Sequence, residues 1–410
     1  MKHFLAYGNS DQASFRETTI RERIDYMTVP GTIAAYYPDA TAAFVLSSKL
    51  DYLIDPRTPL FQGQILQPKA SHVSLAGHMG SVVQDVLGDG SSPVRFSASV
   101  YTDDAVRAMA SRIVDMQRNY GSRADDVAEK LDYYRGLLAE VAGTSTAASE
   151  EEGRPPSFVL APYFASESPS DPWWSRNELI WDTCKGLESA SDISAVASVT
   201  NASFLQQAIQ AIPPELNPTS FFWITGFNER QASVANLEQV WQQVADIAER
   251  KLVNLYGSFF SICMEKGGLW GLNNGLGYSE SRSWPELSAT GAAPARYYVP
   301  RLHMYLPPAT ARLVIESDSF FACDCNLCGA QGPQRVTGLR YHELKHHFVL
   351  CRTWEIGLVG DNDLNELANH LQESAFRFET NVAPNLPSRI RVDTAFLRRW
   401  ESVLRSFSGA

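Results

Sequence analysis

The sequence has few of the features that mark a membrane protein or a disulfide-stabilised protein. Its 410 residues include only six cysteines, too few for a disulfide framework in a chain of this length. The longest apolar runs, such as 258–264, are far shorter than the roughly 20 residues that cross a bilayer. The apolar stretch at the N-terminus is also too short for a secretory signal. We therefore expect a cytoplasmic protein with no membrane partner.

An excess of positive charge is also absent. The net charge is -11, and 44% of the residues are hydrophobic and 20% charged, as is ordinary for a folded globular protein. Because phosphate binding depends on Lys and Arg displacing counterions, this balance disfavours a protein that coats nucleic acid without specificity. A local basic surface is compatible with it.

Apolar runs that read as strands alternate with helical patterns, which predicts an α/β fold with a mainly parallel sheet. For residues 1–322 we expect a (β/α)₈ TIM-like barrel with insertions, and the alternative is an open, doubly wound sheet. An acidic, proline-bearing segment at 143–157 predicts an exposed loop or linker. Residues 323–410 should form a helical zinc-binding subdomain. The expected strands are 26–29, 52–55, 157–164, 220–226, 252–264 and 296–306, and the clearest helices are 103–141, 177–188, 233–251, 308–316, 341–356 and 364–378.

Three cysteines stand within six positions, as Cys323-x-Cys325-x2-Cys328. Thiolates at this spacing can wrap one soft divalent ion, and tetrahedral zinc needs a fourth nitrogen or sulfur ligand. A predicted helix downstream offers four candidates, which are His342, His346, His347 and Cys351. A closed site with four protein ligands leaves no position for a substrate, so we expect structural Zn²⁺.

A second motif overlaps this helix. His342-Glu343-x-x-His346 matches the H-E-x-x-H pattern, in which two histidines bind zinc and the glutamate activates water. This motif gives the alternative of a zinc-dependent hydrolase. Lys345 at an interior position of the motif and the three cysteines upstream both disfavour it.

The cysteine cluster followed by His346-His347-Phe348-Val349 resembles the zinc subdomain of the tRNA-guanine transglycosylases. That subdomain follows a (β/α)₈ barrel. The resemblance implies that His346 is the fourth ligand, with His347 and Cys351 as alternatives, since the spacing from Cys328 is shorter than in most members.

Other segments follow the family's order. Asp55, with Phe61-Gln62 after it, is similar to a motif whose aspartate closes over the base, and Gly267-Gly268-Leu269 is similar to a turn that hydrogen-bonds the heterocycle. The resemblance implies that the last barrel strand is 317–322 and that an aspartate nucleophile lies near it, for which Asp318 is the candidate, with Asp324 behind it.

The departures from the family indicate a divergent branch, such as the relatives that insert 7-deazaguanine bases into DNA. Pro56-Arg57-Thr58-Pro59 replaces the family's Ser-Gly-Gly. The resemblance implies base exchange, in which guanine in DNA or tRNA is replaced by a purine or 7-deazapurine base, with a homodimer or an accessory protein as a further partner. A carboxylate would attack the sugar and a second group would handle protons. A third class is a non-catalytic, zinc-stapled protein that binds nucleic acid.

Overall fold

The structure is a computed structural model that describes residues 1–8, 11–122, 128–142, 154–247, 249–276, 280–284, 287, 294–329 and 332–409. Nine strands form one sheet in the order β7-β6-β3-β2-β1-β11-β10-β9-β8, and every pair in it is parallel. Its strands are β1 (Lys2–Ala6), β2 (Tyr26–Pro30), β3 (Asp51–Asp55), β6 (Phe158–Leu160), β7 (Ile193–Ser194), β8 (Val196–Val199), β9 (Thr219–Ile224), β10 (Lys251–Asn254) and β11 (Leu269–Gly275).

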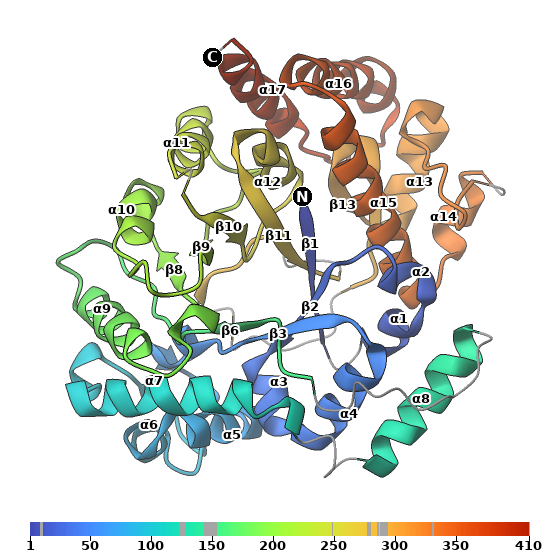
Figure 1. Cartoon of the computed structure of the whole chain (residues 1–410). Helices are drawn as coiled ribbons and strands as arrows, with labels where there is room; N and C mark the ends of the chain where they lie inside the picture. The colour runs from blue at the N-terminus through green and yellow to red at the C-terminus, as the bar shows by residue number, and fades with distance from the viewer. Residues whose placement is uncertain are drawn as a thin grey trace.

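The two edges of this sheet meet, so the sheet curls into a nearly closed barrel. The edge strands β7 and β8 are separated in the chain by Ala195 alone. The Ala161 amide donates to the Ser194 carbonyl at 3.0 Å, and the Phe221 amide donates to the Ala195 carbonyl at 2.9 Å. Figure 1 shows the strands as a central ring with the helices outside it. The prediction of an α/β barrel with parallel strands is confirmed, and the alternative of an open sheet is wrong.

The helices surround the barrel, and several begin at a residue whose side chain caps the helix. Thr102 caps α7 and Ser233 caps α11, while Asp363 and Glu366 form a capping box on α16. The helices are α1 (Gln12–Arg16), α2 (Thr18–Arg21), α3 (Gly31–Tyr36), α4 (Pro38–Ser48), α5 (Ala70–Met79), α6 (Ser81–Leu87), α7 (Asp103–Arg118), α8 (Ala128–Ala142), α9 (Pro172–Lys185), α10 (Leu205–Gln210), α11 (Val234–Ala245), α12 (Phe259–Cys263), α13 (Pro308–Ser317), α14 (Gln334–Gly338), α15 (Tyr341–Asp361), α16 (Leu364–Arg377) and α17 (Ala395–Phe407).

Aromatic rings fill the barrel at the amino-terminal ends of its strands. The Phe4 ring lies 4.5 Å from Tyr26, 6.2 Å from Phe158, 5.8 Å from Phe221 and 6.1 Å from Trp270, measured between centroids. These residues come from five different strands, so their contacts define the inside of the barrel. This end of the barrel is therefore a packed core.

Four expected elements differ from the structure. Residues 296–306 form an antiparallel hairpin of β12 (Tyr297–Val299) and β13 (Met304–Leu306) in place of the expected barrel strand. A separate short antiparallel pair, which was not expected, joins β4 (Gln64–Ile65) to β5 (Val94–Arg95). No strand spans 317–322, because α13 ends at Ser317 and a 3₁₀ turn follows at Ser319–Phe321. The expected helix 103–141 is divided into α7 and α8, and the expected strand 252–264 ends at Asn254, before α12.

The C-terminal helices pack directly on the barrel. Trp400 of α17 is fully buried and belongs to the same hydrophobic core as Leu53 of β3. Its indole N–H donates to the carbonyl of Glu229 at 3.0 Å. The loop expected at 143–157 lies largely outside the described residues, since only 154–157 are described. Among the helices that the structure describes, none combines the length and the apolar character needed to cross a membrane.

Candidate metal centre and barrel mouth

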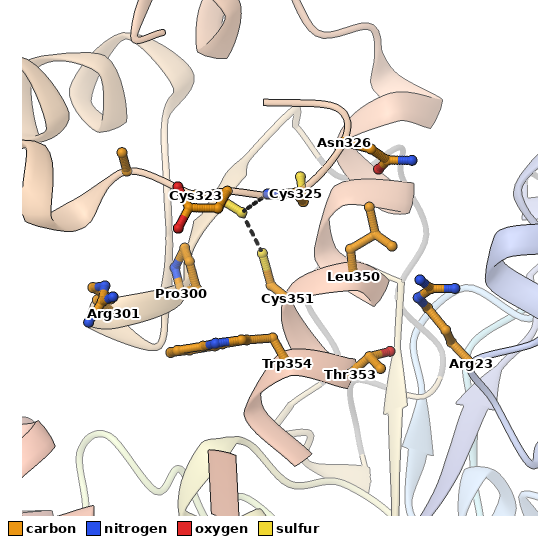
Figure 2. A pocket seen from close by; sticks show the side chains of 12 residues that line it. Arg23, Pro300, Arg301, Cys323, Cys325, Asn326, Leu350, Cys351, Thr353 and Trp354 are labelled. Atoms are coloured by element: carbon orange, nitrogen blue, oxygen red, sulfur yellow. Dashed lines mark hydrogen bonds between the residues drawn. The ribbon is translucent and has the colours of Figure 1, made fainter. Parts of the chain in front are cut away.

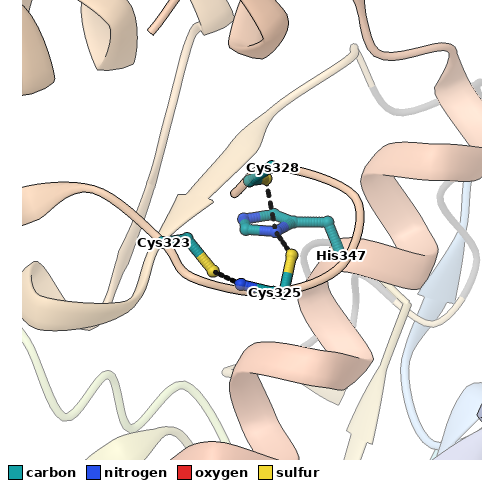
Figure 3. A group of neighbouring side chains, drawn as sticks. All are labelled: Cys323, Cys325, Cys328 and His347. Carbon is teal, nitrogen blue, oxygen red and sulfur yellow. Dashed lines mark hydrogen bonds between the residues drawn. The ribbon is translucent and has the colours of Figure 1, made fainter. Parts of the chain in front are cut away.

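The three clustered cysteines lie on a tight loop between the 3₁₀ turn Ser319–Phe321 and α14 (Figures 2 and 3). The amides of Cys328 and Gly329 both donate to the Cys325 carbonyl, at 3.0 and 2.8 Å. The Cys325 amide points at the Cys323 sulfur, 3.4 Å away. The local backbone therefore turns all three thiols toward one point.

His347 of α15 completes this group. Its Nδ1 lies 3.5 Å from the Cys325 sulfur and 3.4 Å from the Cys328 sulfur, as Figure 3 shows. The ligand atoms of Cys323, Cys325, Cys328 and His347 all lie within 4.8 Å of one another, and this is the one group of metal-ligating side chains that converges within the described part of the chain. Sulfurs bound to one tetrahedral zinc ion would be about 3.8 Å apart, which this spacing suits. The four residues could therefore hold a metal ion.

The surroundings of His347 prepare its ring for a metal. Nε2 lies 2.7 Å from the carbonyl oxygen of Tyr298, which can only accept, so Nε2 carries the hydrogen and Nδ1 presents its lone pair to the sulfurs. The Tyr297 ring stacks on the imidazole at 4.2 Å, and its hydroxyl lies 3.4 Å from the Cys328 sulfur. Burial lowers the pKa of His347, but the cysteines around it raise it to about 9 overall. A bound divalent cation would supply the positive charge in place of that proton.

Cys351 lies one helical turn after His347 on the same face of α15. Its sulfur is 3.8 Å from the Cys323 sulfur (Figure 2) and 3.7 Å from Nδ1 of His347. It therefore borders the cluster as an additional thiol.

The prediction of His346 as fourth ligand is corrected by the structure. His346 is hydrogen-bonded through Nε2 to the Thr19 hydroxyl, away from the sulfurs. Neighbouring residues of a helix point about 100° apart, so only one of the two histidines can face the loop.

The expected hydrolase residues do not converge either. The Glu343 carboxylate accepts the Arg340 amide at 2.6 Å and pairs with Arg335 at 2.8 Å, which caps the start of α15. These bonds lower the pKa of Glu343 and leave it a poor base. His342 and Glu343 are absent from the group that could hold a metal among the described residues.

Asp55 lies at the carboxyl-terminal ends of the strands, which we call the barrel mouth. It ends β3 and is in register with Pro30, the last residue of β2. Leu53, two residues earlier, belongs to the same core as Phe4, whereas Tyr52 and Ile54 belong to the outer core. Because side chains alternate along a strand, Asp55 faces the inside of the barrel.

The Asp55 carboxylate is held by residues that follow two adjacent strands. Its Oδ1 accepts the Tyr163 hydroxyl at 2.8 Å and the Arg57 amide at 3.1 Å. Among the residues that the structure describes, its Oδ2 has a single, longer contact, 3.4 Å from Arg57 Nε. Only 4% of the Asp55 side chain and 14% of the Arg57 side chain are exposed. The two carboxylate oxygens therefore differ in their hydrogen bonding, and Oδ2 is the more weakly bonded of the two.

Two further residues complete what we call the mouth cluster, which consists of Asp55, Arg57, Tyr163, Tyr256 and Arg282. Tyr256 follows β10, four strands from β3 in the sheet order, so it reaches Arg57 across the barrel. The guanidinium of Arg282 lies 5.8 Å from the centre of the Tyr256 ring. Burial lowers the pKa of Arg57, but Tyr256, Asp55 and Tyr163 raise it overall. Burial also raises the pKa values of Tyr163 and Tyr256, so both remain hydroxyl donors.

The other predicted site residues do not surround Asp55 as a base pocket. Phe61 is fully buried in the core, and the Gln62 amide both accepts from and donates to the main chain of Ala165. Gly267, Gly268 and Leu269 lie where β11 begins, at the end of the barrel opposite the mouth.

Asp318 is also remote from a strand end. It caps the 3₁₀ turn after α13 by accepting the Phe320 amide at 2.9 Å. Its other oxygen contacts Arg377 at 3.4 Å and Asn381 at 2.8 Å. Because the expected strand 317–322 is a helix end and a turn, the structure does not bring Asp318 to Asp55.

Sequence reasoning missed four of the five residues in the mouth cluster. Arg57 has a weak signal in Asp55-Pro-Arg57, directly after a predicted strand. Tyr163 and Tyr256 lie inside or beside apolar runs, where aromatic residues are expected for packing alone. Comparisons with protein-family models, curated proteins and solved structures found no match for the chain.

Proposed function

We propose that this protein is a (β/α)₈ barrel enzyme of the guanine transglycosylase type, stapled by a structural zinc ion. If β7 and β8 are counted as one strand interrupted at Ala195, the barrel has the eight parallel strands of that fold. The three cysteines and His347 supply a closed Cys₃His donor set, as structural zinc sites use. The zinc would fix the loop 323–328 to α15 and take no part in the chemistry.

The observation that carries this proposal is the buried, inward-facing carboxylate of Asp55 at the barrel mouth. In barrels of this kind the reacting groups lie at the carboxyl ends of the strands. Asp55 meets that condition, and the hydrogen bonds to Oδ1 hold the group while Oδ2 stays less engaged. Asp318 has no part in the proposal.

The reaction would proceed in two displacements. Oδ2 of Asp55 attacks C1′ of a guanosine in the polynucleotide, the bond from C1′ to the base breaks, and the guanine takes the electron pair and a proton from water. The incoming purine or 7-deazapurine then attacks C1′ through its ring nitrogen, gives its proton to water and displaces the Asp55 carboxylate. Tyr163 and Tyr256 are neutral hydroxyls within the mouth cluster and can orient the carboxylate and the base. The target nucleotide must leave its stack to reach them.

The test is incorporation of labelled guanine, and of a labelled 7-deazaguanine, into tRNA and into DNA by the zinc-loaded protein. Asp55→Asn preserves the size of the side chain, and we expect it to lower the exchange rate by about a thousandfold or more. Asp318→Asn is the matched control and should leave the rate within about twofold. Equal loss in both variants at unchanged melting temperature would contradict Asp55 as the nucleophile.

One observation favours a second candidate, a non-catalytic protein that binds nucleic acid. Asp55 is paired with Arg57, and both side chains are nearly closed off from solvent. A carboxylate in such a buried ion pair can also have a purely structural role at the barrel mouth. Binding of tRNA or DNA by the wild-type protein, without exchange of any labelled base, would select this candidate.

A further inference from the structure

A pocket of about 510 Å³ lies beside the cysteine cluster, outside the barrel. Cys323, Cys325 and Cys351 form one wall of it, as Figure 2 shows. Arg23, which precedes β2, forms another. The pocket is thus at the end of the barrel opposite Asp55, and its volume is typical of sites for small ligands.

Arg301 enters the pocket as a fixed cation. Its guanidinium carbon lies 4.4 Å from the centre of the Phe320 ring and 6.0 Å from that of Trp354. Stacking of this kind holds the guanidinium plane and leaves its N–H edge available for an anion. Within the described part of the chain, no carboxylate lies within 4.0 Å of Arg301, whereas Arg230 and Arg352 are both ion-paired.

Arg23 supplies a second cation. Figure 2 shows Arg23 and Arg301 on opposite sides of the pocket. Arg23 donates through Nη1 to the Thr19 carbonyl at 3.2 Å, and it too has no carboxylate partner among the described residues. Two guanidinium groups without acidic partners can bind a phosphate, singly or from two sides.

The remaining walls suit a planar, polar ring. The Trp354 side chain is exposed although tryptophan usually packs inside, and 38% of the residue is accessible. The amide of Asn326 and the hydroxyl of Thr353 border the same space and offer both donors and acceptors. Asp324 is the one acidic residue in the lining, and it is exposed at the rim.

We propose that this pocket binds a nucleoside phosphate, with the base against Trp354 and the phosphate on one of the two arginines, Arg301 or Arg23. The nucleotide is either free or one residue of a polynucleotide, since both present the same chemistry. This site is additional to the proposed transglycosylase site and does not depend on Asp55. Asp324 weakens the affinity by repelling the phosphate, so its removal should strengthen binding.

The experiment measures equilibrium binding to the full zinc-loaded chain by calorimetry, with guanosine 5′-monophosphate, guanosine, inorganic phosphate and a short single-stranded oligonucleotide as probes. The monophosphate should bind at least tenfold more tightly than guanosine or phosphate. Arg301→Gln and Trp354→Ala should each weaken its binding by about tenfold. Asp324→Asn should strengthen it severalfold. Arg312→Gln, which removes an exposed, paired arginine, is the control and should change nothing.

The results distinguish a free nucleotide from a polynucleotide as the ligand, and they distinguish binding in this pocket from base exchange at Asp55. If only the oligonucleotide requires Arg301, the ligand is a polynucleotide residue, and if the monophosphate requires it as well, free nucleotides also bind. Binding that Arg301→Gln, Arg23→Gln and Trp354→Ala all leave unchanged overturns the proposal, provided that zinc content and melting temperature match the wild type. Asp55→Asn must leave this binding intact, so loss of base exchange and loss of pocket binding are distinguishable.

Discussion

At the scale of single residues, two adjacent histidines of α15 have different roles. His347 points its Nδ1 at the sulfurs of Cys325 and Cys328, while His346 contacts Thr19. We expect His347→Ala to reduce bound zinc well below one ion per chain and to lower the melting temperature, because a tetrahedral site loses its only nitrogen ligand. His346→Ala should retain one zinc ion per chain. Metal content by mass spectrometry after dialysis checks both, and zinc loss in the His346 variant alone would refute the assignment.

The sequence located this site but could not choose its histidine. Three cysteines at short spacing predict a metal whatever the surrounding fold. The choice between His346 and His347 depends on which face of α15 turns to the loop, and that is a matter of tertiary packing. One local signal was present, because His347 and Cys351 are four residues apart and therefore share a helix face.

At the scale of secondary-structure elements, a buried ionic network joins α15 to the rest of the fold. Arg352 pairs with Glu280 and, at 2.7 Å, with Glu355. Glu355 also accepts the Tyr298 hydroxyl at 2.7 Å, and Arg230, from the segment after β9, pairs with Glu280. The Arg352 and Glu355 side chains are fully buried, so this pair lies in the interior of the protein.

Removing one member of this network should destabilise the protein strongly. We expect Arg352→Met to lower the free energy of unfolding by about 3–5 kcal/mol, because it leaves Glu355 buried without its arginine and leaves Glu280 paired with Arg230 alone. The matched control is Arg312→Met, which removes an exposed pair with Glu316 on α13 and should change the free energy by less than about 1 kcal/mol. Urea unfolding measures both. Similar values for the two variants would mean that the network contributes no more than a surface pair.

The alternation of strands and helices was predictable, but several individual strands were not. Parallel strands buried on both faces lack the period of two that identifies a half-exposed strand. β11 also contains two glycines and two asparagines, and its first residue belongs to the sequence Gly267-Gly268-Leu269, which resembles a turn. The hairpin 297–306 has the apolar content of a barrel strand, and only tertiary contacts reveal its antiparallel pairing.

At the scale of the whole molecule, stability should fall in acid because several histidines are buried as neutral rings. Burial, aided by nearby positive charge, lowers the pKa values of His3 and His72 to about 4 and that of His370 to about 3. The unfolded chain binds these protons near pH 6.5 and the folded chain does not. The contribution of these neutral histidines to the free energy of unfolding should therefore be complete above pH 6.5. It should decrease as the pH falls toward 4.

His72 allows a sharp test of this dependence. It is 2% exposed, and its Nδ1 accepts the Lys69 amide at 3.2 Å at the start of α5, a bond that protonation would abolish. Glutamine at this position can accept the same amide without titrating. His72→Gln should therefore reduce the loss of stability between pH 6.5 and 4.5 by on the order of 1 kcal/mol per pH unit. Urea unfolding at saturating Zn²⁺ measures the slope, and a slope identical to that of the wild type would show that His72 titrates normally in the folded protein.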